Sequence, residues 1–323
     1  MMSIRDFEAK QIVFVFLQQK EKLSFKNDNL VVTTAEGKTK YQITCYRIFA
    51  VFIVGHFVMT SGLIQRSHKF AFPVFLMTNS MKVYEMFGGR MEGNVVLRKI
   101  QYAYDSLEIG KHILHNKLVC QRELLNRQRN KSFELKEAIK KIDSYAEAIR
   151  NYEGDLEGLL GYEGSAARLY FKNHFNNIEW NGRKPRIKTD FVNSTLDIGY
   201  TILFNIIDAL LQNYGFDTYC GVLHRQFYMR KSLVCDLIEP FRPIVDAQVR
   251  KAINLQQCKK EDFQIIRNQY LLKWECNAVY VQFIVRGIFE YKTEIFMYVQ
   301  QFYRAMMKGK PAQDFPVFKF GEL

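Results

Sequence analysis

Hydrophobic and polar positions alternate, or form short apolar blocks, over roughly the first 89 residues of the chain. This is the pattern of strands that are half-buried against a core. The turn signal Asn27-Asp28-Asn29 separates two of these runs, and Gly88-Gly89-Arg90 closes the region. We therefore predict a small β-domain over residues 1–89, with a short helix at 61–68 and strands at 12–17, 23–25, 30–34, 41–45, 48–54, 74–77 and 82–86.

The period of the hydrophobic positions changes from two to nearly four after residue 94. Apolar residues at 97, 100, 104, 107, 114 and 118 predict one long helix. Further helices are predicted after Ser132, around Glu163, over 192–214, and beyond Asp246 to about residue 308. The predicted fold class is therefore α+β, in which the N-terminal β-domain is followed by a larger all-α domain over residues 90–323.

Glu163 lies within the apolar stripe of its predicted helix. Positions 156, 159, 160, 163, 167, 170 and 171 share one helical face, and every member except Glu163 is apolar or small. Gly164 and the small residues after it would let another backbone come close. The pattern indicates a carboxylate that points inward, although an interfacial glutamate that extends to solvent would produce the same stripe.

A second group of polar residues lies in the apolar segment 221–246. His224 follows a glycine turn, and Asp236 and Glu239 are three residues apart, so that they would share one face of a helix. Desolvating a lone charge is costly, so buried carboxylates need a partner. One interpretation is an acidic first helical turn capped by Ser232, with Glu239 paired to Arg242.

The other interpretation joins the two segments. Glu163, His224 and Glu239 together would make a three-ligand metal site. Two carboxylates and one imidazole suit Mg²⁺ or Mn²⁺ better than zinc.

These residues also carry a resemblance to a known family. The segments LLGYEGSAARLYF and GVLHRQFYMRKSLVCDLIEPFRPIVD resemble the CRISPR-associated adaptation integrase, the spacer-acquisition endonuclease. That family carries E-G followed by small residues and Y-F, then G-x-x-H, then D-L-x-E-P-F-R-P. All three elements occur here in this order, and the resemblance covers most of the chain beyond about the first 45 residues.

The resemblance implies a metal-dependent DNA endonuclease and integrase that inserts new spacer DNA into a CRISPR array. The implied chemistry is attack of a 3′-hydroxyl on a phosphodiester. Carried onto this chain, the catalytic residues and metal ligands are Glu163, His224 and Glu239, and Asp236 is an auxiliary acid. Transesterification needs no nucleotide hydrolysis, which agrees with the absence of a G-x-x-x-x-G-K-[ST] motif from the sequence.

The resemblance also implies partners. They are double-stranded DNA, as spacer precursor and as CRISPR repeat, and a second copy of the chain, since the β-domain forms a homodimer in the family. A small ferredoxin-like adaptation subunit can join the assembly. The implied location is the prokaryotic cytoplasm.

Composition indicates a folded, basic protein. Of 323 residues, 48% are hydrophobic and 15% aromatic, which excludes a disordered chain, and the net charge of +13 with a pI of about 9.3 favours a polyanionic partner. Basic solubility alone would also produce this charge. The predicted DNA contacts flank the His224 turn or lie in a loop at 176–188 that we expect to be mobile. They are Arg225, Arg230, Lys231, Arg183, Lys184 and Arg186.

A further basic face is predicted on the long helix. Eight Lys or Arg residues lie between positions 98 and 131, Lys117 among them. Such a face is either simply solvated or available to DNA phosphates.

The six cysteines form no C-x-x-C pair and are typical of reduced thiols in a cytoplasmic protein. A zinc site at Cys220, His224 and Cys235 would lack a fourth ligand. We find no secretory signal, and the apolar run at 48–59 is shorter than the roughly 20 residues of a membrane span. No membrane association is expected.

Two other functions stay open. The first is a metal-dependent nuclease that cuts branched DNA without integrating it. The second is a non-catalytic nucleic-acid-binding scaffold in which Glu163 and Glu239 form structural ion pairs.

Overall fold

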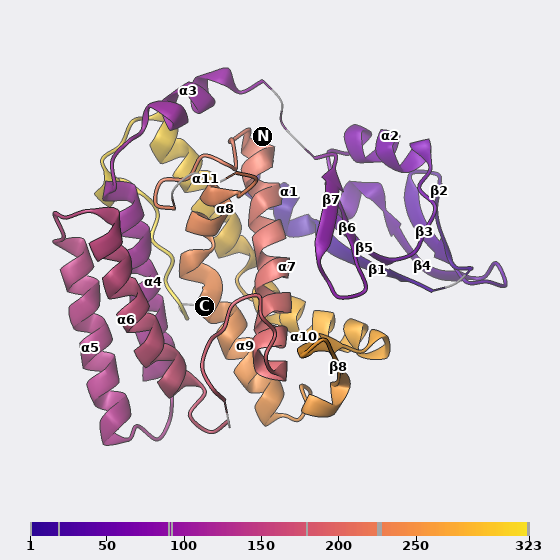
Figure 1. Ribbon diagram of the computed structural model, residues 1–323. Helices are drawn as coiled ribbons and strands as arrows, with labels where there is room; N and C mark the ends of the chain where they lie inside the picture. Colours follow the sequence, from indigo (N-terminus) through magenta and orange to yellow (C-terminus); the bar gives the residue numbers. More distant parts are fainter. Residues whose placement is uncertain are drawn as a thin grey trace. The chain divides into compact units, whose positions relative to one another are not determined.

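The computed structural model describes residues 2–18, 20–89, 91, 93–178, 180–224 and 228–321. An N-terminal group of strands is followed by a larger helical region, and the chain is 53% helical and 15% strand. This confirms the predicted α+β class. The contacts divide the chain into two compact units, the first comprising residues 1–94 and 208–216 and the second residues 95–207 and 217–323 (Figure 1). The assignment of 1–89 as a dimerisation domain and 90–323 as a catalytic domain stays a prediction.

The described part of the first unit contains a four-stranded sheet in the order β1-β5-β6-β7 and a three-stranded antiparallel sheet in the order β2-β3-β4. Strands β1, β5 and β6 are parallel, and β7 is antiparallel to β6. The elements are α1 (Ile4–Ala9), β1 (Gln11–Leu17), β2 (Lys22–Lys26), β3 (Asn29–Thr33), β4 (Thr39–Thr44), β5 (Ile48–Gly55), α2 (Ser61–Lys69), β6 (Val74–Met77) and β7 (Val83–Phe87).

The strands follow their hydrophobic pattern. In β1 every second residue from Val13 is buried, whereas β5 is apolar and buried along almost its whole length, as expected of a central parallel strand. The predicted hairpin turn holds Asn27 and Asp28 at positive φ, a conformation that Asn and Asp tolerate well.

The last turns of a long helix, α7 (Phe191–Tyr214), belong to the first unit. The backbone N–H of Met91 donates to the carbonyl of Gln212 at 3.0 Å, and the side-chain amide of Asn94 donates to the carbonyl of Tyr214 at 3.0 Å. Gly215 ends the helix at a φ of +84°, as the sequence predicts for a helix-terminating glycine. The first unit is therefore assembled from two segments that are far apart in sequence.

The second unit is mainly helical. Helices α4, α5 and α6 pack side by side (Figure 1), and α4 also contacts α8, α9 and a single 3-10 turn, η2 (Glu239–Phe241). The bounds are α3 (Val95–Ala103), α4 (Glu108–Asn126), α5 (Phe133–Arg150), α6 (Leu156–His174), α8 (Ser232–Leu237), α9 (Arg242–Asn254), α10 (Asn277–Phe289) and α11 (Lys292–Met307).

Two predictions about this region need correction. The single long helix from residue 97 is broken between α3 and α4, because the hydroxyls of Tyr104 and Ser106 accept the backbone N–H groups of Ile109 and Glu108 and so start a new helix. The region also contains a hairpin, β8 (Phe263–Ile266) and β9 (Gln269–Leu272), where continuous helix was expected. Its turn holds Arg267 and Asn268 at positive φ, without the glycine that usually marks such turns.

The segment 309–321 folds back onto α4. The amide of Asn116 donates to the carbonyl of Phe318 at 2.7 Å, and the Phe318 N–H donates to the Asn116 side chain at 2.8 Å. The Phe318 ring packs on Phe241 of η2, with ring centroids 4.7 Å apart. This contact fixes η2, and with it the adjacent Glu239, against α4.

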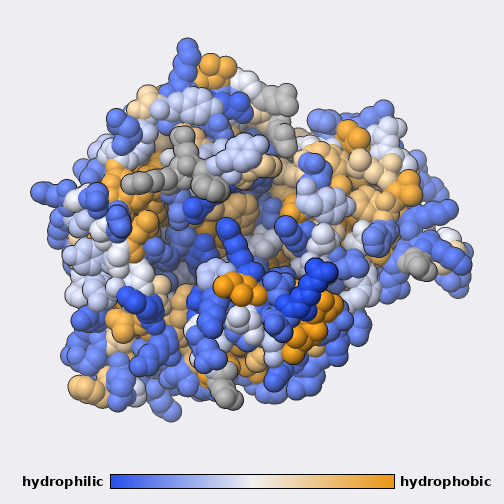
Figure 2. Space-filling model, in the orientation of Figure 1, coloured by the Kyte–Doolittle hydropathy of each residue, from blue (hydrophilic) through white to orange (hydrophobic). Residues whose placement is uncertain are grey.

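Helix α7 is long and apolar enough to cross a membrane by length and composition alone. However, 83% of its most apolar stretch is buried inside the structure, as in the core helix of a globular protein. The face shown in Figure 2 is mostly hydrophilic, and its apolar side chains gather in small separate patches. Such scattered patches are ordinary on protein surfaces.

Candidate functional site

Glu163 on α6 and Glu239 in η2 meet at one lysine of α4. Lys117 Nζ forms an ion pair with Glu163 Oε1 and lies 2.6 Å from Glu239 Oε2. The Lys117 and Glu239 side chains are only 7% and 5% exposed, whereas that of Glu163 is 24% exposed. The structure therefore turns Glu163 inward and brings two distant carboxylates to one buried ammonium group. The close backbone approach expected at Gly164 is wrong, because that residue is exposed and a Cβ atom there would meet no other atom within 4 Å.

The burial of Lys117 overturns its placement on a solvated basic face. Its neighbours on the buried stripe of α4 include Ile113, Leu114, Leu118 and Gln121. These positions recur at helical spacing and include 117, so the sequence carried a signal that a count of charges along the chain overlooked.

Arg242 supplies a second cation to Glu239. Its Nε lies 3.0 Å from Glu239 Oε2, as one of the two interpretations of the sequence predicts. Burial, the largest contribution, raises the pKa of Glu239, but the positive charges of Arg242 and Lys117 outweigh burial and leave that pKa lowered. Burial likewise lowers the pKa of Lys117, and the attraction of Glu163 and Glu239 reverses it, so that the pKa is raised. The ion pairs thus favour the charged forms of both Glu239 and Lys117.

The expected helix cap at Ser232 is wrong. Lys231 occupies the cap position of α8 without a side-chain capping bond, and Asp236 lies at the other end of this short helix. The carboxylate of Asp236 instead accepts hydrogen bonds from the backbone N–H groups of Val222, Leu223 and His224, at 2.7 to 3.0 Å. Asp236 therefore fixes the turn that carries the histidine.

Asp236 also orients the ring of His224. Its Oδ1 lies 2.5 Å from His224 Nδ1, and because a carboxylate accepts, Nδ1 is the donor of this hydrogen bond and Nε2 takes no part in it. Gly221 makes this packing possible, because a Cβ atom there would lie 2.6 Å from Asp236 Oδ2. A histidine held by a carboxylate in this way is typical of metal ligands.

The predicted three-ligand cluster is not assembled. Within the described residues, no three or more His, Cys, Asp or Glu side chains are grouped so as to hold a metal ion, and this also applies to Cys220, His224 and Cys235 as zinc ligands. The donor set nevertheless fits a hard divalent cation, because Glu163 and Glu239 already converge on one positive charge and His224 keeps a nitrogen free of Asp236. In this structure the positive charge between them is the Lys117 ammonium.

A family model described as "CRISPR associated protein Cas1" matches residues 14–284, which is most of the chain.

The chain belongs to the Cas1 family.

Curated Cas1 relatives agree with this assignment. A CRISPR-associated endonuclease Cas1 of Thermodesulfovibrio yellowstonii is 28% identical over 265 residues, covering 77% of this chain and 82% of the relative. One from Pyrobaculum aerophilum is 31% identical over 237 residues, covering 70% of this chain and 77% of the relative. The predicted family resemblance is confirmed.

Solved structures show the same fold. A CAS1 protein from Thermotoga maritima matches with a TM-score of 0.79 at 18% identity, over 95% of this chain and all of that one. A casposase bound to integration product matches with a TM-score of 0.79 at 19% identity, over 97% of this chain and 96% of that one. A chain of a Cas6-RT-Cas1–Cas2 complex gives a TM-score of 0.81 at 22% identity, and this chain spans only 36% of that longer chain.

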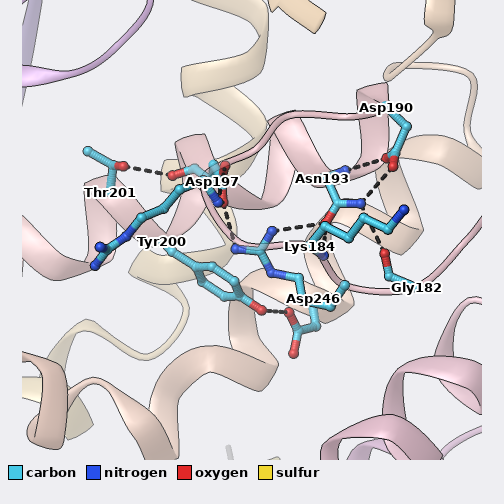
Figure 3. Close-up of polar contacts among 10 residues, drawn as sticks. Gly182, Lys184, Asp190, Asn193, Asp197, Tyr200, Thr201 and Asp246 are labelled. Atoms are coloured by element: carbon cyan, nitrogen blue, oxygen red, sulfur yellow. Dashed lines mark hydrogen bonds and ion pairs between the residues drawn. The ribbon is translucent and has the colours of Figure 1, made fainter. Parts of the chain in front are cut away.

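In this Cas1 chain the basic loop at 176–188 is held at its centre. Arg183 pairs with Asp197 at 2.6 Å and donates to Asn193, and its side chain is only 12% exposed. Asn193 also accepts from the Lys184 N–H and donates to the Gly182 carbonyl (Figure 3). These bonds contradict the expected mobility of this part and give Arg183 internal partners, while its predicted contact with DNA stays a prediction.

The other predicted DNA contacts differ in exposure. Lys184 and Arg186 are exposed. Arg230 and Lys231 are partly buried beside the His224 turn, and Arg225 lies outside the described residues. Lys184 and Arg186 are thus the candidates that the fold leaves most open to a phosphate backbone.

Asp246, a further buried carboxylate in this Cas1 chain, was not predicted to have any role. Asp246 accepts a hydrogen bond from the Tyr170 hydroxyl at 2.7 Å. It accepts another from the Tyr200 hydroxyl (Figure 3). Burial raises the pKa of Asp246 to about 6, and the tyrosine hydrogen bonds only partly oppose it. His174 stacks on Tyr170 and donates from Nε2 to the Asp246 carbonyl, and burial lowers the pKa of His174 to about 3.

Proposed function

We propose that this chain is a metal-dependent DNA endonuclease and integrase of CRISPR adaptation, which inserts spacer DNA by attack of a 3′-hydroxyl on a phosphodiester. One observation carries the proposal. In a chain of the Cas1 family, Glu163 and Glu239 converge from α6 and η2 on one cation position, and His224, which Asp236 orients, interacts electrostatically with Glu239. The curated relatives, named as endonucleases, support the nuclease part.

The proposed ligands of Mg²⁺ or Mn²⁺ are Glu163, His224 and Glu239. When bound, a divalent cation would polarise the phosphoryl oxygen and lower the pKa of the attacking hydroxyl. Asp236 holds His224 through Nδ1, so that Nε2 is the ring nitrogen that would bind the cation. Arg242 holds Glu239 ionised and in place.

The proposed partners are double-stranded DNA, a second copy of the chain through the β-domain, and a small ferredoxin-like adaptation subunit. Support comes from the fold, which is shared with solved structures titled as complexes with Cas2 and with DNA. The net charge of +13 also suits a DNA partner. The proposed location is the prokaryotic cytoplasm.

A strand-transfer assay tests the function. Labelled DNA with a free 3′-hydroxyl is incubated with a repeat-containing target and Mg²⁺ or Mn²⁺, and joined and cut products are measured separately. We expect Glu163→Gln and Glu239→Gln to lower the joining rate by at least about a thousandfold, and Asp236→Asn by about ten- to a hundredfold because it acts through His224. Glu157→Gln, an exposed glutamate on the same helix, should leave the rate unchanged.

Joining that survives Glu163→Gln would contradict the assignment of the ligands. Cutting of branched DNA without any joining would favour the first alternative, a nuclease that does not integrate.

The second alternative, a non-catalytic scaffold, has one observation in its favour. The ion pairs of Glu163 and Glu239 with Lys117 are what a purely structural role predicts. Calorimetric titration with Mn²⁺ separates the two, since a scaffold would bind no metal and Glu163→Gln would then change nothing.

A further inference from the structure

Lys117 occupies the position that the proposed metal needs. Its ammonium nitrogen is the shared neighbour of one oxygen of Glu163 and one of Glu239, at 2.6 Å from the latter. Mg²⁺ lies about 2.1 Å from carboxylate oxygens. A cation that bridged these same two oxygens would therefore compete with the Lys117 ammonium for one position.

Charge leads to the same exclusion. Lys117 and Arg242 together balance Glu163 and Glu239, and the Lys117 and Glu239 side chains are almost fully buried. A divalent ion added with Lys117 still in place would leave an excess of two positive charges where water screens poorly. Withdrawal of the ammonium would remove one of them.

The surroundings of Lys117 would allow its ammonium group to leave the two glutamates. Glu239 Oε2 lies 2.6 Å from Lys117 Nζ and 3.0 Å from Arg242 Nε, so that two cations share one carboxylate oxygen. One turn along α4, the buried Gln121 Oε1 accepts no hydrogen bond from the described residues. The same helix face thus offers an acceptor for an ammonium that moves away.

We propose that Lys117 is a built-in counter-ion that holds Glu163 and Glu239 together before metal arrives, and that a divalent cation enters only by displacing it. This inference rests on the proposed function, because it takes the two glutamates as metal ligands. Lys117 is therefore a positioning residue that keeps the two carboxylates converged and limits the affinity for metal.

Mn²⁺ titration of the full chain by calorimetry tests the displacement. Lys117→Met keeps the length of the side chain and removes its charge. We expect this variant to bind Mn²⁺ at least about tenfold more tightly than the wild type, because no cation has to be displaced. Its melting temperature without metal should be lower, and saturating Mn²⁺ should raise it by more than in the wild type.

The matched control is Lys111→Met, on the same helix. Lys111 donates to the Tyr152 carbonyl and pairs with Glu108, away from the two glutamates. The affinity of the Lys111→Met variant for Mn²⁺ should equal that of the wild type. If Lys117→Met does not fold, Lys117→Gln takes its place.

A measurement on the wild type removes the dependence on variants. The ammonium signal of Lys117 in a ¹H–¹⁵N spectrum should shift or vanish over the same Mg²⁺ concentrations that fill the site. A signal unchanged at saturating Mg²⁺ would overturn the displacement.

The outcomes separate the two proposals. If Mn²⁺ binds the wild type, is lost in Glu163→Gln, and binds Lys117→Met no more tightly, the metal site stands and the role of Lys117 is overturned. If neither the wild type nor Lys117→Met binds Mn²⁺, the proposed function and this inference are both overturned.

Discussion

Two buried carboxylates of the helical unit, Glu239 and Asp246, are stabilised in opposite ways. Glu239 is surrounded by cations, Lys117 and Arg242, and its pKa is lowered. Asp246 is surrounded mainly by hydroxyl donors, and its pKa is raised to about 6. The guanidinium of Arg242 joins the two groups, since it also lies over the Tyr200 ring at 4.8 Å.

We interpret the Glu239 group as part of the functional site and the Asp246 group as a structural contact between helices. Coulomb attraction acts at any orientation, so the proposed exchange of the Lys117 ammonium for a metal ion would leave Glu239 paired with a cation. The tyrosine hydroxyls of the Asp246 group belong to packed rings and bind in one geometry, which fixes α6, α7 and α9 to one another. The two groups should therefore respond differently to mutation.

The largest expected effect on stability is at Asp246. Asp246→Ala leaves two buried tyrosine hydroxyls without an acceptor, and we expect the free energy of unfolding to fall by about 3 kcal/mol or more. Glu163→Gln should cost less than about 1 kcal/mol, because Glu163 is partly exposed and Lys117 keeps Glu239. Denaturant unfolding measures both. Equal losses in the two variants would remove the distinction between the groups.

Acid should affect the Asp246 group through His174. Its pKa of about 3 in the folded state lies below its value in the unfolded chain, about 6.5, so the unfolded chain binds the extra proton. This contribution is complete above pH 6.5 and is lost as the pH falls, by about 2 kcal/mol between pH 6.5 and 5. Asp246 acts in the opposite direction, because its raised pKa makes the folded state take up a proton between about pH 6 and 4.

His174→Phe keeps the ring stacked on Tyr170 and removes the titrating group. We expect its unfolding free energy to fall by about 2 kcal/mol less than that of the wild type between pH 6.5 and 5, in denaturant titrations at each pH. Replacing the exposed His68 by Phe should leave the acid dependence as it is. An unchanged acid dependence in His174→Phe would contradict the burial of a neutral imidazole.

The smallest effect on stability is expected at Lys184 and Arg186, which lie beside Arg183 but are exposed. The double change to Ala should alter the unfolding free energy by less than about 0.5 kcal/mol. It should nevertheless weaken DNA binding and reduce the salt slope by about 1 for each phosphate that the protein no longer neutralises. Binding measured over a range of salt concentrations tests this, and an unchanged slope would place the DNA elsewhere.

Most of the fold could be predicted from the spacing of hydrophobic residues along the sequence. The strands of the first unit and helix α7 follow directly from it, because their burial is strong and regular. The break before α4 depends on two side-chain hydroxyls, and the β8–β9 hairpin has no glycine in its turn. Local chemistry of this kind leaves little trace in a pattern of apolar positions.

The site residues could be predicted from sequence motifs, but the side chains that pair with them could not. The motifs singled out Glu163, His224, Asp236 and Glu239, whereas the residue that joins the two glutamates, Lys117, belongs to no motif and comes from another helix. The sequence also could not show that Arg183 forms an ion pair with Asp197, because this pairing depends on how the loop folds over α7.

The two-segment composition of the first unit has a consequence for its synthesis. The hydrogen-bond partner of Asn94, the carbonyl of Tyr214, is synthesised 120 residues later in the chain. At about 5–20 residues per second, a ribosome needs on the order of ten seconds to deliver it. Throughout that interval the emerging strands lack the closing helical turns, so their aggregation during translation should depend on elongation speed.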